Sequence, residues 1–168
     1  ISCQMVCVGL LNHFLENNVV AAERISRSDL LLAVSTLTLE NNPISLQRQA
    51  MCTDAGELLT VLSHSLIFDE STSSDKVLNN LIDLSGPDSP NSLRLNASEA
   101  LLNLSRIGEN KEHFASHTNR PRLFSSLTSF ALSGNTIMCE NALETIYNLC
   151  DCTEGETCYF ICRDNNVS

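Results

Sequence analysis

The chain has no tryptophan, and aromatic residues make up only 5% of its 168 residues, whereas apolar residues reach 43%. Leucine, isoleucine, valine, alanine and cysteine must therefore fill most of the core, which is typical of helix-on-helix packing. Glycine is also scarce, with six residues. The sequence contains neither a phosphate-binding glycine-rich loop nor a G-x-S-x-G nucleophile motif. We therefore expect a protein that is not an enzyme and needs no cofactor.

Basic residues are few, with ten Lys and Arg against twenty Asp and Glu, which gives a formal net charge of -10. This charge opposes a phosphate backbone, so we expect no direct binding of nucleic acid. No apolar run approaches the roughly 18 residues that a membrane span needs, and no basic segment leads into an apolar stretch at the start. We expect no membrane contact. The first residue is Ile1 and not Met, which suggests a fragment of a longer protein.

The chain has eight cysteines, but its ample apolar content differs from that of small disulfide-stabilised domains. A reducing compartment, cytosol or nucleus, is the expected location. The densest group could offer four thiolates to a tetrahedral zinc ion, and consists of Cys150, Cys152, Cys158 and Cys162. Its spacing is not a paired C-x-x-C pattern, so we expect ordinary thiols and no metal, with zinc or a disulfide as the alternative. His113 and His117 are expected to form a surface pair.

Helical periodicity dominates the sequence, and no segment alternates strictly enough to indicate a sheet. Helices are predicted over residues 5–15, 19–25, 30–39, 45–66, 75–84, 92–105, 110–116, 122–132, 136–150 and 156–162. Gly56 is expected to break or kink the long helix. Polar loops are expected near 69–74 and 85–91, within a single domain that spans residues 1–168. The predicted fold class is all-α.

A weak internal repeat indicates how these helices are arranged. Similar apolar segments start at positions 10, 58, 101 and 146, so their spacings are 48, 43 and 45. Armadillo and HEAT units recur every 40–47 residues or so. Each such unit is a small group of helices that buries its apolar face only by stacking on its neighbours. The repeat therefore predicts an armadillo-like right-handed helical solenoid of about four repeats.

The segment 100–104 resembles the third helix of an armadillo repeat, in which an Asn faces a groove and bonds the backbone of an extended peptide. Asn12, Asn103 and Asn148 match that position and are the candidate residues of a partner-binding groove. The Trp that the family usually carries four residues earlier is absent. The alternative is that these side chains bond neighbouring helices or face solvent. The sequons at Asn96 and Asn103 fall within a predicted helix and are interpreted as chance matches.

A more specific resemblance covers residues 3–43 and 93–151. The segments 5–12, 97–104 and 122–124 are similar to the C-terminal armadillo-like region of the Osa-type large subunit of SWI/SNF chromatin remodellers, which elsewhere carries an AT-rich interaction domain. This resemblance implies a nuclear, non-catalytic scaffold that contacts other core subunits of the remodeller and contributes to transcription regulation. The alternatives are a cytosolic armadillo adaptor for extended peptides and a small zinc module at the C-terminal cysteines.

Overall fold

Helices account for all the regular secondary structure in the part of the chain that the computed structural model describes, which comprises residues 3–16, 18, 20–21, 28–39, 46–68, 72–116, 118 and 120–150. These helices are α1 (Cys3–Glu16), α3 (Ser28–Leu39), α4 (Leu46–Ser63), α5 (Thr72–Leu84), α6 (Asn91–Arg106), α7 (Asn110–Ser116), α8 (Arg120–Ala131) and α9 (Thr136–Cys150). The all-α prediction is confirmed for these residues.

Most helix boundaries lie within a few residues of those that the sequence predicts. One difference is that α5 begins at Thr72, inside the stretch expected to be a loop. A second is that α4 continues through Gly56 without a break, so the expected interruption is wrong. The predicted helix over 19–25 is described only at Val20 and Ala21, which are helical, and the one over 156–162 lies outside the described residues.

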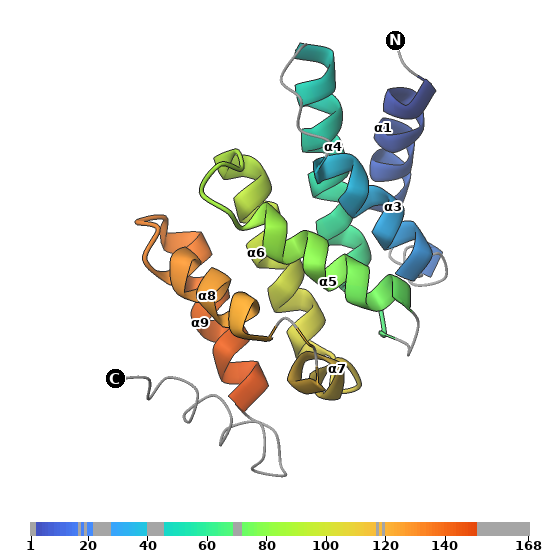
Figure 1. Cartoon of the computed structure of the whole chain (residues 1–168). Coiled ribbons are helices and arrows are strands. Elements are labelled where there is room, and N and C mark those ends of the chain that lie inside the picture. The colour runs from blue at the N-terminus through green and yellow to red at the C-terminus, as the bar shows by residue number, and fades with distance from the viewer. Residues whose placement is uncertain are drawn as a thin grey trace.

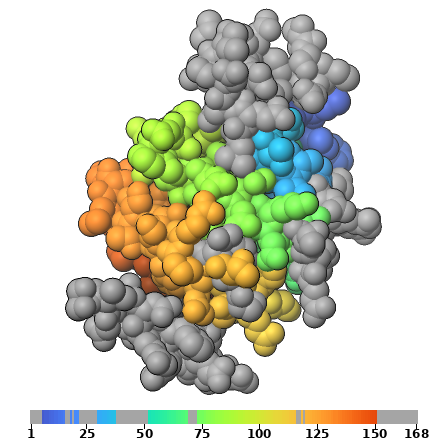
Figure 2. Space-filling model, in the orientation of Figure 1, coloured from blue at the N-terminus to red at the C-terminus, as the bar shows by residue number. Residues whose placement is uncertain are grey.

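The helices form two layers (Figure 1). In the first layer α1 packs against α4, α4 against α6, and α6 against α9. In the second layer α3 packs against α5, and α5 contacts α8. Each second-layer helix also packs against the first-layer helix that follows it in the chain, namely α3 on α4, α5 on α6 and α8 on α9. In Figure 2 the blue and cyan N-terminal residues and the orange C-terminal residues lie on opposite sides of the surface, with green between them.

The core is continuous along this double layer, and leucine dominates it. Its most enclosed helix is α6, in which all residues from Ala100 to Ser105 are buried. The reason is that α6 has α4 on one side, α9 on the other and α5 in the second layer. A helix that is buried nearly all round must be apolar nearly all round, and the sequence of α6 from residue 100 to 104 meets this requirement.

Gly56 lets α4 approach α6 closely. A Cβ atom built at this position would lie 2.5 Å from Asn96 Nδ2 and 3.0 Å from Leu93 Cδ2, both on α6. A Cβ atom here would force the ends of these two side chains to move, so glycine fits the space without any shift. Gly56 therefore serves helix packing and does not interrupt the helix.

Asn110, the first residue of α7, forms hydrogen bonds with the segment that follows α4. It is fully buried, and its Nδ2 donates to the carbonyl oxygens of Leu66 at 2.9 Å and Leu104 at 3.1 Å. Its Oδ1 accepts the backbone N–H of Phe68 at 2.7 Å. Buried backbone groups outside regular secondary structure need such partners, and one side chain supplies them for Leu66 and Phe68 while also bonding the last turn of α6 at Leu104.

Candidate partner-binding site

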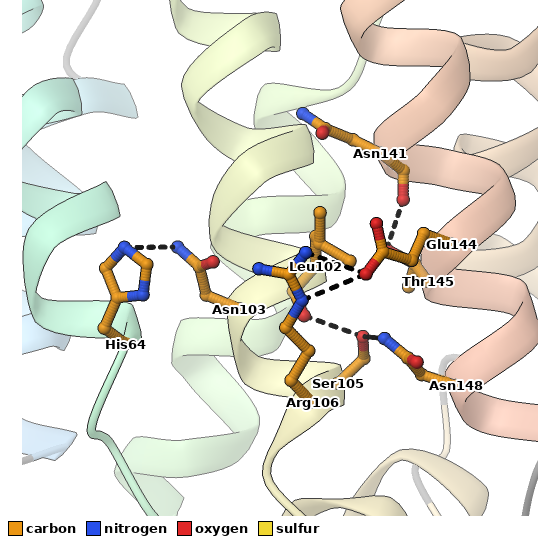
Figure 3. Close-up of polar contacts among 9 residues, drawn as sticks. All are labelled: His64, Leu102, Asn103, Ser105, Arg106, Asn141, Glu144, Thr145 and Asn148. Atoms are coloured by element: carbon orange, nitrogen blue, oxygen red, sulfur yellow. Dashed lines mark hydrogen bonds and ion pairs between the residues drawn. The ribbon is translucent and has the colours of Figure 1, made fainter.

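Asn103 lies at the junction of α6 and α4, and its side chain is only 3% exposed. Its Nδ2 donates to Ser63 Oγ at 3.1 Å and to the carbonyl oxygen of Thr60 at 3.4 Å. The same nitrogen lies 3.4 Å from Nε2 of His64, and Figure 3 draws this contact as a dashed line. The amide group of Asn103 is thus engaged by the preceding first-layer helix.

Asn148 occupies the corresponding place at the junction of α9 and α6. Its Nδ2 donates to Ser105 Oγ at 3.1 Å (Figure 3). One heptad earlier on α9, Asn141 donates to Ser98 Oγ at 3.0 Å. Both pairs are 43 residues apart in the sequence. Two Asn side chains on one helix therefore meet two Ser side chains on the preceding helix with the same spacing.

The interface between α4 and α6 has a similar arrangement, in which the facing residues are 40 and not 43 positions apart. The heptad pair on α6 is Asn96 and Asn103, and the small residues opposite on α4 are Gly56 and Ser63, which are also one heptad apart. A residue with little or no side chain therefore faces an Asn at each of these places. We call this arrangement of two Asn against two small residues the Asn–Ser junction.

The serines of the junction have a second role. Ser63, Ser98 and Ser105 each donate their hydroxyl proton to the backbone carbonyl three residues earlier, at 2.7, 2.7 and 2.8 Å. With its proton committed, the hydroxyl oxygen is available as an acceptor for the Asn amide of the next helix. The second layer repeats this chain of bonds, because Asn80 donates to Ser35 Oγ at 2.9 Å and Ser35 donates to the Leu32 carbonyl at 3.0 Å.

Asn12 departs from this pattern. It is 7% exposed on α1, and its Nδ2 donates to Glu57 Oε2 of α4 at 2.9 Å. Its buried Oδ1 has no hydrogen-bond partner. The contact therefore points forward along the chain, to the helix that follows, whereas Asn103 and Asn148 bond the helix that precedes them.

The three predicted groove residues thus lie at three successive junctions of the first layer. Asn12 joins α1 to α4, Asn103 joins α6 to α4, and Asn148 joins α9 to α6. The side-chain amide of each of the three Asn residues donates a hydrogen bond to a neighbouring helix of the first layer. Their role in a partner groove stays a prediction, and the arrangement corresponds to the alternative in which Asn side chains bond neighbouring helices.

The acceptors of these bonds were not predicted from the sequence, although a signal was present. The two sequons place Ser98 and Ser105 one heptad apart on α6, and Asn141 and Asn148 repeat that spacing on α9. The paired residues are 43 apart, whereas the apolar segments of α6 and α9 recur after 45, so alignment of the apolar repeat does not pair them. In the second layer, Asn80 and Ser35 are 45 residues apart.

Apolar surface is exposed on both end helices of the first layer. On α1 the side chains of Val6, Leu10 and Phe14 are 48%, 65% and 52% exposed. On α9, Leu143 and Tyr147 are 55% and 66% exposed. Large apolar side chains that are spaced by one helical turn and open to solvent are a feature of protein-binding surfaces. Their exposure was not predicted from the sequence, because their spacing resembles that of core positions.

Charges near the stack form pairs across its junctions. Arg106 of α6 binds Glu144 of α9, with Nη2 2.7 Å from Oε1 (Figure 3). Both side chains are about half exposed, so the pair adds little stability. His113 is partly buried, not a surface residue as expected, and its Nε2 lies 3.2 Å from Asp75 Oδ1. The sequence places Asp75 far from His113, which hid this contact.

The cysteine group is described only at Cys150, which is partly buried at the end of α9. Its expected companions Cys152, Cys158 and Cys162 lie outside the described residues. Cys52 is buried, and its Sγ lies 3.6 Å from the Leu37 carbonyl oxygen. Within residues 3–150, as far as they are described, no three His, Cys, Asp or Glu side chains are placed to hold a metal ion.

Comparisons with family models, curated proteins and solved structures found no match to this chain. Among the helices of the described residues, none is both long and apolar enough to cross a membrane.

Proposed function

We propose that this chain is part of an armadillo-like solenoid of about four repeats, and that it serves as a non-catalytic scaffold for other proteins. The observation that supports the proposal is the Asn–Ser junction, since a heptad pair of Asn faces a heptad pair of small residues both between α4 and α6 and between α6 and α9. Such a stack presents helix faces and offers a long surface for partners. The exposed apolar side chains of α1 and α9 are where we expect partners to dock.

The resemblance to the Osa-type subunit extends this proposal. We infer that the chain is a nuclear segment of a SWI/SNF-type remodeller, where it contacts other core subunits and contributes to transcription regulation. The acidic net charge of -10 supports protein partners over nucleic acid. Because the Asn amides are engaged within the stack, docking through helix faces is favoured over capture of extended peptides by Asn12, Asn103 and Asn148.

Co-purification from cells tests this assignment. The tagged chain is expected to recover remodeller core subunits, and a Leu143→Asp and Tyr147→Asp double variant is expected to recover at least about tenfold less, because a charge is placed in an apolar contact. Leu132→Asp is the matched control, since Leu132 is 80% exposed on the turn after α8. Circular dichroism should show that all variants keep their helices.

Two outcomes would contradict the assignment. Failure of the wild-type chain to recover any core subunit would exclude the remodeller assignment. If a variant with Asn103→Ala and Asn148→Ala stays folded but loses all partners, while the α9 variant keeps them, the chain is a peptide-binding adaptor.

A further inference from the structure

The turn before α6 carries a serine whose side chain takes no part in the packing of the stack. Ser89 is followed by Pro90, and this is the only Ser-Pro or Thr-Pro dipeptide in the chain. The backbone N–H of Ser89 donates to the Gly86 carbonyl oxygen at 3.1 Å, whereas its hydroxyl has no hydrogen-bond partner among the described residues. Ser89 is partly exposed and Pro90 is exposed. The Ser89 hydroxyl is therefore open to a modifying enzyme.

The backbone around this serine has the form that such an enzyme needs. Pro90 is extended, with φ -55° and ψ 143°. A proline also favours an extended backbone for the residue before it, and it presents no backbone N–H. An exposed, extended Ser-Pro dipeptide is the acceptor that proline-directed protein kinases use.

The start of α6 has no side-chain cap within the described residues. Its N-cap residue is Pro90, which has no polar side-chain atom. Helical hydrogen bonding begins with the backbone N–H of Arg94, which donates to the Pro90 carbonyl oxygen at 3.0 Å. The N–H groups of residues 91–93 therefore have no acceptor within the helix. These groups and the helix dipole favour negative charge at this end, which Ser89 directly precedes.

The guanidinium of Arg94, one turn into α6, is a second and independent indication of an anion. Its Nε is buried and has no hydrogen-bond partner in the described part of the chain, and its Nη2 donates to Ser129 Oγ at the long distance of 3.5 Å. Arg106 and Arg122 each pair with a carboxylate, but Arg94 has no such pair with any described residue. In a chain of net charge -10, an unpaired cation with a buried free donor indicates a site for an anion.

Arg94 is directed towards the turn that carries Ser89. The bond from its backbone N–H to the Pro90 carbonyl oxygen puts the two residues one turn apart on the same side of the helix. A helical side chain leans towards the N-terminus of its helix, which here is the end next to Ser89. A guanidinium binds phosphate through two parallel N–H···O bonds, and the free Nε of Arg94 is suited to one of them.

We propose that Ser89 is a phosphorylation site for a proline-directed protein kinase, and that Arg94 and the free N–H groups at the start of α6 bind the phosphate. The kinase transfers the γ-phosphoryl group of ATP to Ser89. A bond forms from Ser89 Oγ to phosphorus, the bond from that phosphorus to the bridging oxygen of the departing ADP breaks, and the hydroxyl proton passes to the catalytic Asp of the kinase. This inference does not depend on the proposed scaffold function.

Mass spectrometry of the full chain, purified from eukaryotic cells with phosphatases inhibited, tests the site. We expect phosphate on Ser89 in the wild-type chain and loss of that phosphate in Pro90→Ala, which keeps the hydroxyl but removes the directing residue. Ser133 is the matched control, since it also lies in a turn before a helix but is followed by Gly134. Absence of phosphate from Ser89, equal phosphate in Pro90→Ala, or equal phosphate on Ser133 would overturn the proposal.

Thermal unfolding tests the binding of the phosphate. Treatment of the purified full chain with a proline-directed kinase and ATP is expected to raise its Tm by about 4 °C, because charge-assisted bonds form at the start of α6. In Arg94→Gln the same treatment should raise Tm by less than about 2 °C, since only the helix end remains to bind the phosphate. Arg122→Gln is the control and should keep the full increase, because Arg122 pairs with Asp83 of α5. An equal increase in wild type and Arg94→Gln, or a fall in the Tm of the wild type, would contradict the proposal.

Discussion

Asn110→Ala is expected to lower the free energy of unfolding by about 3 kcal/mol. The substitution removes the partner of the buried Leu66 carbonyl and of the buried N–H of Phe68, and it removes one of two partners of the Leu104 carbonyl, which keeps the N–H of Ile107 at 3.4 Å. A buried polar group left without a partner costs about 1–3 kcal/mol, and water has little access because Asn110 is 0% exposed. The measurement is urea unfolding followed by circular dichroism.

The control for this prediction is Asn91→Ala. Asn91 is also the first residue of a helix, but it is exposed, so its loss should change stability by no more than about 0.5 kcal/mol. Asn110→Asp should remain destabilising, because an ionised carboxylate can accept the Phe68 N–H but cannot donate to the two carbonyl groups. Equal stability of the Asn110→Ala and Asn91→Ala variants would show that Asn110 does not hold the segment after α4.

Gly56→Leu is expected to destabilise the stack by about 2–3 kcal/mol, even though leucine is the better helix former by nearly 1 kcal/mol. The reason is the close approach of α4 and α6, where the Cβ alone would meet Asn96 Nδ2 at 2.5 Å. The larger side chain must push the two helices apart and disturb the neighbouring bond between Asn103 and Ser63. Thermal unfolding and urea titration measure the loss.

A second helical glycine provides the comparison. At Gly9 of α1 the nearest atom to an added Cβ is Asp54 Oδ2 at 3.8 Å, which is an ordinary contact. Gly9→Ala should therefore stabilise the protein by up to about 1 kcal/mol through helix propensity. If Gly56→Leu were tolerated as well as Gly9→Ala, α4 and α6 would not pack as closely as described.

Much of the secondary structure could be predicted from the sequence, because amphipathic periodicity is a local property. The bounds of α7 and α9 agree with the predicted ranges 110–116 and 136–150. Gly56 was misinterpreted for a physical reason. Local rules treat a helical glycine as a weak point, whereas here the absence of a Cβ makes room for the side chains of Asn96 and Leu93 on a helix that is distant in the sequence.

The candidate site could be predicted only in part. The repeat identified Asn103 and Asn148 as equivalent positions, and both lie at junctions between first-layer helices. Sequence alone does not tell in which direction an Asn amide points, because that depends on what the neighbouring helix offers. Ser63 and Ser105 offer an acceptor, since their own protons are bonded to backbone carbonyl groups.

The exposure of α1 could not be predicted from apolar pattern alone. Leu10 and Leu101 start similar segments of the sequence, yet Leu10 is exposed and Leu101 is buried. The reason is the number of neighbours, since α6 packs against α4, α5 and α9, whereas α1 packs against α4 among the described helices. Burial therefore depends on the surrounding helices and not only on the helix itself.

Double-mutant cycles on the two Asn–Ser contacts test most directly the claim that one junction is used repeatedly. Asn103 with Ser63 and Asn148 with Ser105 are replaced by Ala singly and together, and unfolding free energies are compared. We predict coupling of about 0.5–1.5 kcal/mol for both pairs, and values near zero, within about 0.5 kcal/mol, for Asn148 with Ser63, which belong to different junctions. Coupling at only one pair, or at neither, would contradict the repeated junction and the stack that is built on it.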